Sequence, residues 1–460
     1  MNTIKPNLMR SALAIALLGS CLVAQAKISD AELARLGQDL TPLGAEKAGN
    51  ADGSIPAWSG KWSGTPPHVK FAGAGTPYPD PYADEKPLFT ITAENMEQYA
   101  DNLSDGQKAL LKRYGKTFRI PVYPSHRDFR VDEVTEEFIR KNATTAELAG
   151  GGNEAHNAWG ASPFPIPQNG AELLFNHTMQ GRARTEEANY IQAVIYPDGN
   201  RTIDKVNYKI FSVWSDPART LGDSAGILSN FMITNLEPVR KKGEIVAGQE
   251  FINAFSQPRQ AWQYAPGQRR VRRAPTVGYD SPTGAGGFRT YDEDRLFNGS
   301  PDRYDWKIVG KRELYIPYNN YLIDEPKVTT EQILATTGHV NPDLMRYEKH
   351  RVWVLEATLK PGSRHIYAKR VMYIDEDSWA AVMADNYDAR GQLWRTNMQT
   401  SIYAYDIKRF HARLGIYQDL IAGSYLVDRL LDGQKPALLN ASQWAQEEFS
   451  PGYLRKLGTR

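Results

Sequence analysis

The pattern of hydrophobic and polar positions changes about a third of the way along the chain. Before residue 150, apolar positions recur at helical spacing behind capping residues, as in the capping box Ser104-Asp105-Gly106-Gln107. After residue 170, apolar and polar residues alternate with a period of two. The sequence therefore predicts helices in the first third of the chain and an antiparallel sheet in most of the rest.

The first third also contains a Pro- and Gly-rich stretch. Pro or Gly recurs every few positions in residues 41–87, and the same stretch contains aromatic residues such as Trp58 and Trp62. We expect an ordered, extended arm that lies on a partner surface, because aromatic side chains are costly to leave in water. The expected helices cover residues 30–36 behind Ser29, 91–103 behind Thr92, 105–115, and 132–148.

Strands are predicted where alternation is bounded by turn residues. Residues 189–196 and 201–211 flank Pro197-Asp198-Gly199-Asn200, which predicts a hairpin. Three turns divide residues 351–407 into an antiparallel meander, with Trp353, Leu355, Ala357 and Leu359 on one face of its first strand. Further strands are expected over 244–255, 261–266, 268–275 and 305–318, the last as a strand pair or one long bent strand.

The N-terminus predicts export. Lys5 and Arg10 precede an apolar run that ends at Ala24-Gln25-Ala26, which is typical of a signal peptide cleaved after Ala26. The alternative is a lipoprotein site at Cys21, the only cysteine of the chain. Cleavage after Ala26 predicts a periplasmic chain of 434 residues without disulfides, which must rely on core burial for stability.

Charge excludes one class of partner. The signal peptide carries two of the 55 Lys and Arg residues and none of the 53 Asp and Glu residues, so the mature chain balances 53 against 53. A nucleic-acid-binding protein needs a basic surface, so no nucleic-acid partner is expected.

The stretch Gly222-Asp223-Ser224-Ala225-Gly226 matches the nucleophile-elbow spacing of hydrolases. The preceding residues, SDPARTL, are not a buried parallel strand, and no His-Gly-Gly lies upstream to form an oxyanion hole. We therefore interpret Ser224 as an N-cap at the start of a helix over AGILSNFMI, and expect no catalytic residues.

Two charged segments have alternative interpretations. Arg269 to Arg273 is either a rim for anionic headgroups or an acidic partner, or a strand whose arginines pair with neighbouring Asp and Glu. The acidic segment 291–306 fails the calcium-loop pattern at Leu296, so we expect a turn-rich loop that pairs with these arginines. The histidines lack metal-ligand spacing, so neither a metal nor a cofactor is expected.

Several stretches resemble one family of secreted bacterial proteins, the domain-of-unknown-function 1329 family. They are TPLGAEKAGNADGSIPAWSG, PGQRRVRRAPTVGYD, LFNGSPDRYDWK and YIDEDSWAAVMADNYDARGQLWR. The resemblance covers nearly the whole mature chain, and QAWQYAPGQRRVRRAP is also similar to lipoprotein-sorting proteins of the LolA/LolB type.

The resemblance implies a mixed α+β, mainly β fold: a large curved antiparallel sheet, formed as a half-open barrel and packed on helices, with a long irregular N-terminal extension. The expected parts are the signal peptide (1–26), the arm and helices (27–170), the half-barrel (171–415) and a C-terminal cap (416–460).

It also implies a non-catalytic periplasmic carrier for a lipid or other hydrophobic molecule. The alternatives are an adaptor between an exporter of the resistance-nodulation-division (RND) type and an outer-membrane barrel protein, or a hydrolase or lyase of an envelope polymer. The aromatic load, 10 Trp, 24 Tyr and 15 Phe, fits either a packed core or an apolar cavity. Strand parity assigns the cavity lining to Trp262, Tyr264, Trp353, Leu355 and Trp394, with Arg270 and Arg272 near a headgroup or partner.

Overall fold

The computed structural model describes residues 28–458. The predicted signal peptide, with Cys21 and the cleavage site, lies outside these residues. Within residues 28–458, no helix combines the length and the apolar character needed to cross a membrane.

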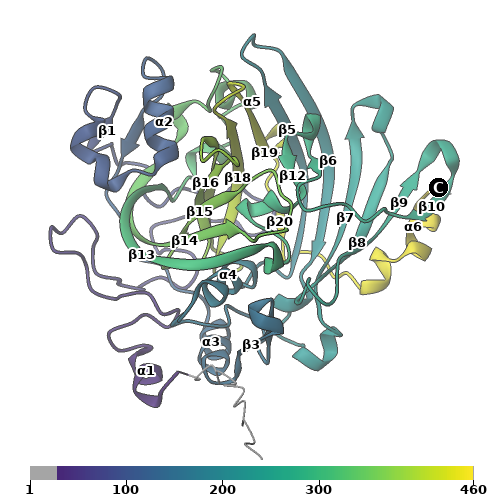
Figure 1. The fold of residues 1–460 in the computed structure, drawn as a ribbon, viewed down its shortest axis with the longest axis horizontal. Coiled ribbons are helices and arrows are strands. Elements are labelled where there is room, and N and C mark those ends of the chain that lie inside the picture. The colour runs from purple at the N-terminus through teal and green to yellow at the C-terminus, as the bar shows by residue number, and fades with distance from the viewer. Residues whose placement is uncertain (1–27, 459–460) are drawn as a thin grey trace, which may run out of the picture.

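One large sheet dominates the molecule (Figure 1). Its strands follow the order β1-β2-β14-β15-β16-β17-β18-β19-β5-β6-β7-β8-β9-β10, and β13 and β20 pair with β14 and β5. All pairings are antiparallel except one contact between β2 and β14. The path starts and ends at different strands and does not close, so the expected mainly β fold with a large open sheet is confirmed.

Two meanders build this sheet and join where β19 pairs with β5. The first contains β5 (Thr185–Ile195), β6 (Arg201–Phe211), β7 (Ile227–Glu237), β8 (Ile245–Phe251), β9 (Gln260–Ala265) and β10 (Arg270–Arg273). The second contains β13 (Tyr304–Pro317), β14 (Tyr347–Leu359), β15 (Lys369–Asp375), β16 (Ala381–Tyr387), β17 (Leu393–Ala404), β18 (Arg409–Asp419) and β19 (Ser424–Leu431). The short strands are β1 (Phe89–Ile91), β2 (Ile120–Val122), β3 (Glu147–Ala149), β4 (Glu154–His156), β11 (Pro282–Thr283), β12 (Arg289–Thr290) and β20 (Leu438–Leu439).

The local predictions with clear turn and cap chemistry are confirmed. The hairpin β5–β6 forms around Gly199, whose φ of 85° suits glycine. Residues 304–317 form one long strand with a bulge between Ile308 and Gly310. The helices α1 (Asp30–Arg35) and α2 (Asp105–Arg113) begin at the capping boxes of Ser29 and Ser104.

Other local predictions are wrong. The residues AGILSNFMI enter strand β7 and form no helix, because they pair with β6 and β8 inside the sheet. The helix predicted over 132–148 is confirmed as α3 (Glu133–Thr145), although it ends earlier than predicted, before β3. Residues 96–102 form a 3-10 helix that begins after Asn95, so Thr92 is not its cap. The helix α4 (Gly170–Thr178) was not predicted. The remaining helices are α5 (Thr330–Ile333) and α6 (Pro451–Gly458).

The second meander is covered on both faces. One face packs against the segment that contains α2 and against residues 318–345, with Leu110, Val352 and Ile416 in the same cluster. The other face packs against α4 and the loop 285–297, in a cluster that includes Leu174 and Leu355. Helices and loops therefore form a layer on each side of this half of the sheet.

The first meander is covered mainly on one face. The C-terminal segment with Phe449 and Leu454 of α6 packs against Ala247 and Tyr264. Figure 1 shows β6 to β10 reaching out from the centre of the molecule, with α6 beside β8 to β10. Residues of the opposite face, such as Ile233 and Val246, stay half-exposed.

The N-terminal arm is ordered and lies on the protein's own second meander. The guanidinium of Arg127 donates to the carbonyl oxygen of Glu46 (2.7 Å) and to both oxygens of Asp377 (2.7 and 2.8 Å). Arg351 on β14 donates to the Ala48 carbonyl oxygen at 2.6 Å. Buried arginines thus hold the arm by its backbone, which explains how a Pro- and Gly-rich segment becomes ordered.

Candidate functional site

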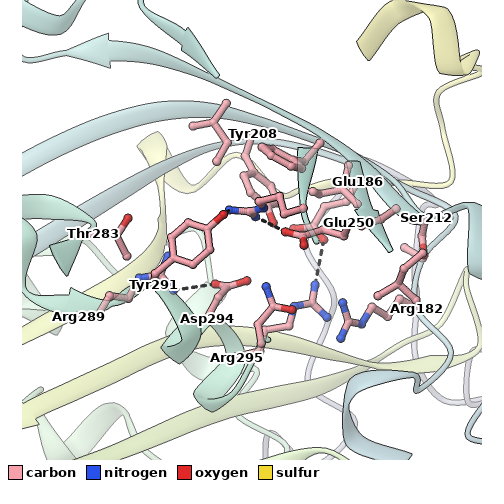
Figure 2. Close-up of a pocket in the computed structure, with 18 residues that line it drawn as sticks. Arg182, Glu186, Tyr208, Ser212, Glu250, Thr283, Arg289, Tyr291, Asp294 and Arg295 are labelled. Carbon is pink, nitrogen blue, oxygen red and sulfur yellow. Dashed lines mark hydrogen bonds and ion pairs between the residues drawn. The ribbon is translucent and has the colours of Figure 1, made fainter. Parts of the chain in front are cut away.

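A pocket lies against the open face of the first meander. Its walls come from the start of β5, from β6, β7 and β8, from Arg259 just before β9, and from the segment 283–298 (Figure 2). The cavity has a volume of about 130 Å³ and opens to solvent.

One wall of the pocket is apolar. Tyr208 and Ile210 on β6 and Phe231 and Ile233 on β7 pair across the two strands, Tyr208 with Ile233 and Ile210 with Phe231. Directly paired residues point to the same face of a sheet, so these four side chains form a continuous surface.

The opposite wall is charged. Arg289 Nη1 lies 2.8 Å from Asp294 Oδ1, and Arg429 Nη2 lies 3.4 Å from the same oxygen. Burial alone would raise the pKa of Asp294, but Arg429 and Arg289 hold it far below its usual value. Asp428 completes this group through its 3.4 Å contact with Arg289. Asp294 is therefore ionised and neutralises charge on the arginines beside it.

Two further ion pairs border the pocket. Arg295 Nη2 lies 3.7 Å from Glu186 Oε2, and Arg259 pairs with Glu250 and donates to the Tyr291 hydroxyl. Burial would raise the pKa of Glu186, yet this pKa is lowered, because the neighbouring groups, His411 first and then Arg429 and Arg295, favour the anion.

Arg182 differs from these arginines. Its Nη2 donates to the Thr178 carbonyl oxygen at 3.1 Å, whereas its Nε is buried without a hydrogen-bond partner in the described chain. Among the described residues, no carboxylate lies within ion-pair distance of it. Burial, followed by repulsion from Arg295, lowers the pKa of Arg182 to about 9. Figure 2 shows its guanidinium beside that of Arg295, inside the pocket.

A second, much smaller cavity of about 30 Å³ adjoins the pocket. Arg182, Glu186 and Arg295 line both spaces, and the inner one also meets His177 and His411. Burial lowers the pKa of each histidine to about 3, so both rings are neutral. The Nε2 atoms of both rings have no hydrogen-bond partner within the described residues.

Irregular backbone places three of the charged side chains. Strand β19 carries a bulge between Val427 and Leu430, and this bulge presents Asp428 and Arg429. Arg295 and Leu296 have φ angles of 52° and 71°, which non-glycine residues rarely adopt. Such conformations cluster at functional sites, because only the surrounding structure can hold them.

The residues predicted to line a cavity lie in three separate regions, and none lines this pocket. Trp262 and Tyr264 on β9 pack with the cluster that contains α6. Trp353 and Leu355 on β14 pack with the cluster around α4. Trp394 on β17 donates to Asp419 and contacts the Tyr367 ring. A role for these five residues in ligand binding stays a prediction.

Arg270 and Arg272 lie on the same sheet face as the pocket. The register pairs Arg272 with Gln263, Gln263 with Val246, and Val246 with Ile233. Trp262 and Tyr264 have the opposite parity and point away from that face. The sequence analysis therefore placed Arg270 and Arg272 at one site with Trp262 and Tyr264, whereas the two pairs lie on opposite faces of the sheet.

The alternative in which Arg269 to Arg273 pair with acidic neighbours is wrong for residues 28–458, where these arginines make no ion pair and Arg270, Arg272 and Arg273 are exposed. The acidic segment does pair with arginines, but with different ones. Asp292 is held by Arg370 at 2.8 Å, and Asp294 by Arg289.

Ser224 has an ordinary turn role. Its hydroxyl donates to the Leu221 carbonyl oxygen (2.8 Å) and accepts from the Gly226 amide (3.1 Å). Ala225 follows in the left-handed region, and β7 begins two residues later. The stretch therefore closes a turn before a strand, and the predicted helix N-cap at Ser224 is wrong.

The pocket residues were missed because their signals are weak in sequence. Arg182 stands in GRAR, Glu186 in RTEE, and Arg295 in the acidic segment, with more than a hundred positions between the first and the last. A lone Arg at the start of a strand reads as a surface residue. The only available signal was the density of opposite charges around Arg295.

Comparison with known proteins identifies the family. The profile of DUF1329, described as a protein of unknown function, matches residues 90–455. The chain belongs to the DUF1329 family. A relative in Pseudomonas aeruginosa, described as an uncharacterized protein, is 43% identical over 463 residues and is covered completely, as is this chain. The resemblance found in the sequence is thereby confirmed.

Solved structures offer more distant likenesses to this DUF1329 protein. A DUF1329 family protein from Desulfovibrio piger is 14% identical, with 59% of this chain and 92% of that chain covered and a TM-score of 0.40. An outer membrane lipoprotein-sorting protein domain from Vibrio parahaemolyticus has the same identity and TM-score, with 59% and 91% covered. A LolA superfamily protein from Nitrosomonas europaea is 13% identical, with 62% and 100% covered and a TM-score of 0.37.

Proposed function

We propose that this protein binds a hydrophobic molecule on the open face of β6 to β8 and carries it through the bacterial periplasm without a covalent step. The observation that supports this proposal is the half-exposed apolar surface of Tyr208, Ile210 and Ile233, with the buried Phe231 ring between them, beside a cavity of about 130 Å³. In the second meander, the equivalent sheet faces are filled by α4 and by the segment around α2.

The energetics allow useful affinity from this surface alone. Apolar area removed from water contributes about 25 cal/mol per Å², so burying roughly 300 Å² of ligand contributes about 7 kcal/mol. The entropy lost on association reduces that value. The ligand would cover the half-exposed side chains of Ile210 and Ile233 in the complex. Binding and release are then sufficient for transfer, and no covalent reaction is required.

The first test is native mass spectrometry, with lipid extraction, on the mature protein purified from the periplasm of its own host. Copurifying hydrophobic mass supports the carrier. The variant Ile233→Asp places a charge on the pocket wall and is expected to abolish this mass. The matched control is Thr234→Asp, because Thr234 is the next residue of β7 and points to the other face. An apo mass for the wild type, together with no binding of fluorescent fatty-acid probes, would contradict the proposal.

A second candidate function is that of an adaptor between an RND-type exporter and an outer-membrane barrel protein. The exposed, unpaired Arg270, Arg272 and Arg273 on the edge strand β10 favour it, since such a row suits an acidic partner. Charge reversal of all three should remove an envelope partner from pull-downs and leave copurifying lipid unchanged. The same arginines would contact anionic headgroups if the carrier docks on a membrane.

A further inference from the structure

The charged wall of the pocket has one positive charge more than it can neutralise. Its arginines are Arg182, Arg259, Arg289, Arg295 and Arg429, and its carboxylates are Glu186, Glu250, Asp294 and Asp428. Each carboxylate already contacts an arginine. The excess positive charge therefore lies on the one arginine of this wall that has no carboxylate as a partner.

That arginine is Arg182, and its position makes the excess costly. It lies where the outer pocket and the inner cavity meet, because it lines both. Its neighbours increase the cost: Arg295 and His177 offer no negative charge, and the nearest polar contact is the neutral Thr178 carbonyl oxygen. Arg182 is part-buried, and its Nε is fully buried. A guanidinium in such a place without a counterion costs free energy, and proteins retain such groups mainly at functional sites.

Further unused hydrogen-bonding capacity surrounds the same point. The Nδ1 of His177 accepts from the Ala381 amide at 3.0 Å, so the neutral ring carries its proton on Nε2. Backbone carbonyl groups of Phe297 and Arg295 lie near that ring, whereas the Nε of Arg182 has no acceptor within hydrogen-bond distance in the described chain. The Nε of Arg182 is thus a donor beside the cavity that no acceptor of the protein receives.

The apolar wall and the unpaired cation belong to one pocket. Tyr208, Ile210 and Phe231 line the same space as Arg182, which lies at its inner end where the second cavity begins. A ligand that covers the apolar wall therefore extends toward a site for one negative charge. An oxyanion there receives charge-assisted hydrogen bonds from a guanidinium in a site of low dielectric constant.

We propose that the ligand is a hydrophobic acid, and that its single oxyanion, a carboxylate or a phosphate monoester, pairs with Arg182 at the inner end of the pocket. This inference rests on the proposed function, because it names the chemical class of the molecule that the open face binds. Arg182 positions the ligand by its charge, while the β6–β7 wall binds its hydrocarbon part.

The test is isothermal titration of the delipidated full mature chain with four probes of equal chain length. Sodium laurate carries a carboxylate, dodecyl phosphate carries a phosphate, and dodecanol and methyl laurate are neutral. We expect the wild type to bind one or both anionic probes about 10- to 100-fold more tightly than the neutral probes, the range given by a hydrogen bond to a charged group. The stronger of the two anions then identifies the headgroup.

The variant Arg182→Met keeps the length of the side chain and removes its charge. We expect it to bind all four probes with the weak affinity that the wild type shows for dodecanol. Arg182→Lys restores a charge without the planar fork, and should recover part of the anion preference. The matched control is Arg240→Met on the exposed segment 239–241, which should bind like the wild type.

The outcomes separate the two proposals. If the wild type binds acids and neutral probes equally, or if Arg182→Met retains the anion preference, the inference about Arg182 is overturned and the carrier proposal stands. If the wild type binds none of the four probes, the carrier proposal itself is overturned. Circular dichroism of each variant verifies that it is folded, and Arg182→Gln serves if Arg182→Met is not.

Discussion

The two meanders of the sheet are built from similar strands but are buried very differently. Every residue of β16 and β19 is buried, because helices and loops cover both faces of the second meander. In the first meander, β9 has one buried residue of six and β10 has none of four. The comparison teaches that one half of the sheet is buried on both faces, whereas the other leaves one face largely uncovered.

The difference arises from what the intervening segments cover. Residues 88–122 and 318–345 pack on one face of the second meander, and α4 with the loop 285–297 packs on the other. The C-terminal segment reaches only one face of β6 to β10. An open sheet face would expose apolar surface at a cost in solubility, so such a surface in a folded protein indicates a binding role.

We expect the largest loss of folding stability from Gly106→Ala, which adds a side-chain atom to the packed interior of the second meander. A Cβ at this position of α2 would overlap the Asp385 carboxylate on β16 and the Thr396 Oγ1 on β17. Overpacking costs up to about 3 kcal/mol and occasionally more, and the buried side chains of Thr396 and Asp385 leave little room to shift. Urea unfolding measures the loss. The control is Gly267→Ala, whose Cβ would meet no neighbouring atom, and an equal loss there would contradict the explanation.

A matched pair of truncations compares the halves directly. Leu355 on β14 is 0% exposed, so Leu355→Ala should lower the free energy of unfolding by about 2–5 kcal/mol. Ile233→Ala on the half-exposed face of β7 should cost only about 1 kcal/mol, since part of its surface already meets water. Both values come from denaturant titration of the ligand-free protein. Equal losses would show that the face of β7 is packed as tightly as β14.

The pH dependence of stability sharpens the same contrast. Burial raises the pKa of Asp385 from 3.8 to about 6. The folded state then binds this proton more tightly than the unfolded state, so stability falls as pH rises from about 4 to about 6 and is constant above. The shift amounts to at most about 3 kcal/mol. Asp385→Asn should remove this part of the pH dependence. Unfolding of both proteins at pH 4 and pH 7 measures it, and parallel curves would contradict it.

The smallest effect concerns the open half. Arg182→Met removes an unpaired cation and should raise the free energy of unfolding of the ligand-free protein by about 1 kcal/mol, because replacement of buried charge by an apolar group is often stabilising. Thermal unfolding of the ligand-free protein measures the gain. A loss of stability would indicate that Arg182 holds the fold together and would remove the argument for a functional cost.

Turn and cap chemistry made the elements predictable. The boxes of Ser29 and Ser104, the turn at Gly199 and the meander in residues 351–407 depend on neighbours within a few positions, so local sequence is sufficient. The prediction for AGILSNFMI was wrong for the opposite reason. An apolar run of that length suits a helix or a strand, and only its pairing with β6 and β8 decides between them.

By itself, the sequence determined the family, the mainly β character, the helix caps and most strands of the sheet. Only the tertiary structure decided which sheet face stays open and which residues meet there. The pocket brings Arg295 next to Arg182 and Glu186, which lie more than a hundred positions earlier in the chain. Long-range strand pairing, the bulge of β19 and the left-handed backbone at Arg295 make this contact possible. Those contacts join residues separated by long stretches of chain, and alternation along a strand gives two faces without saying which one is covered.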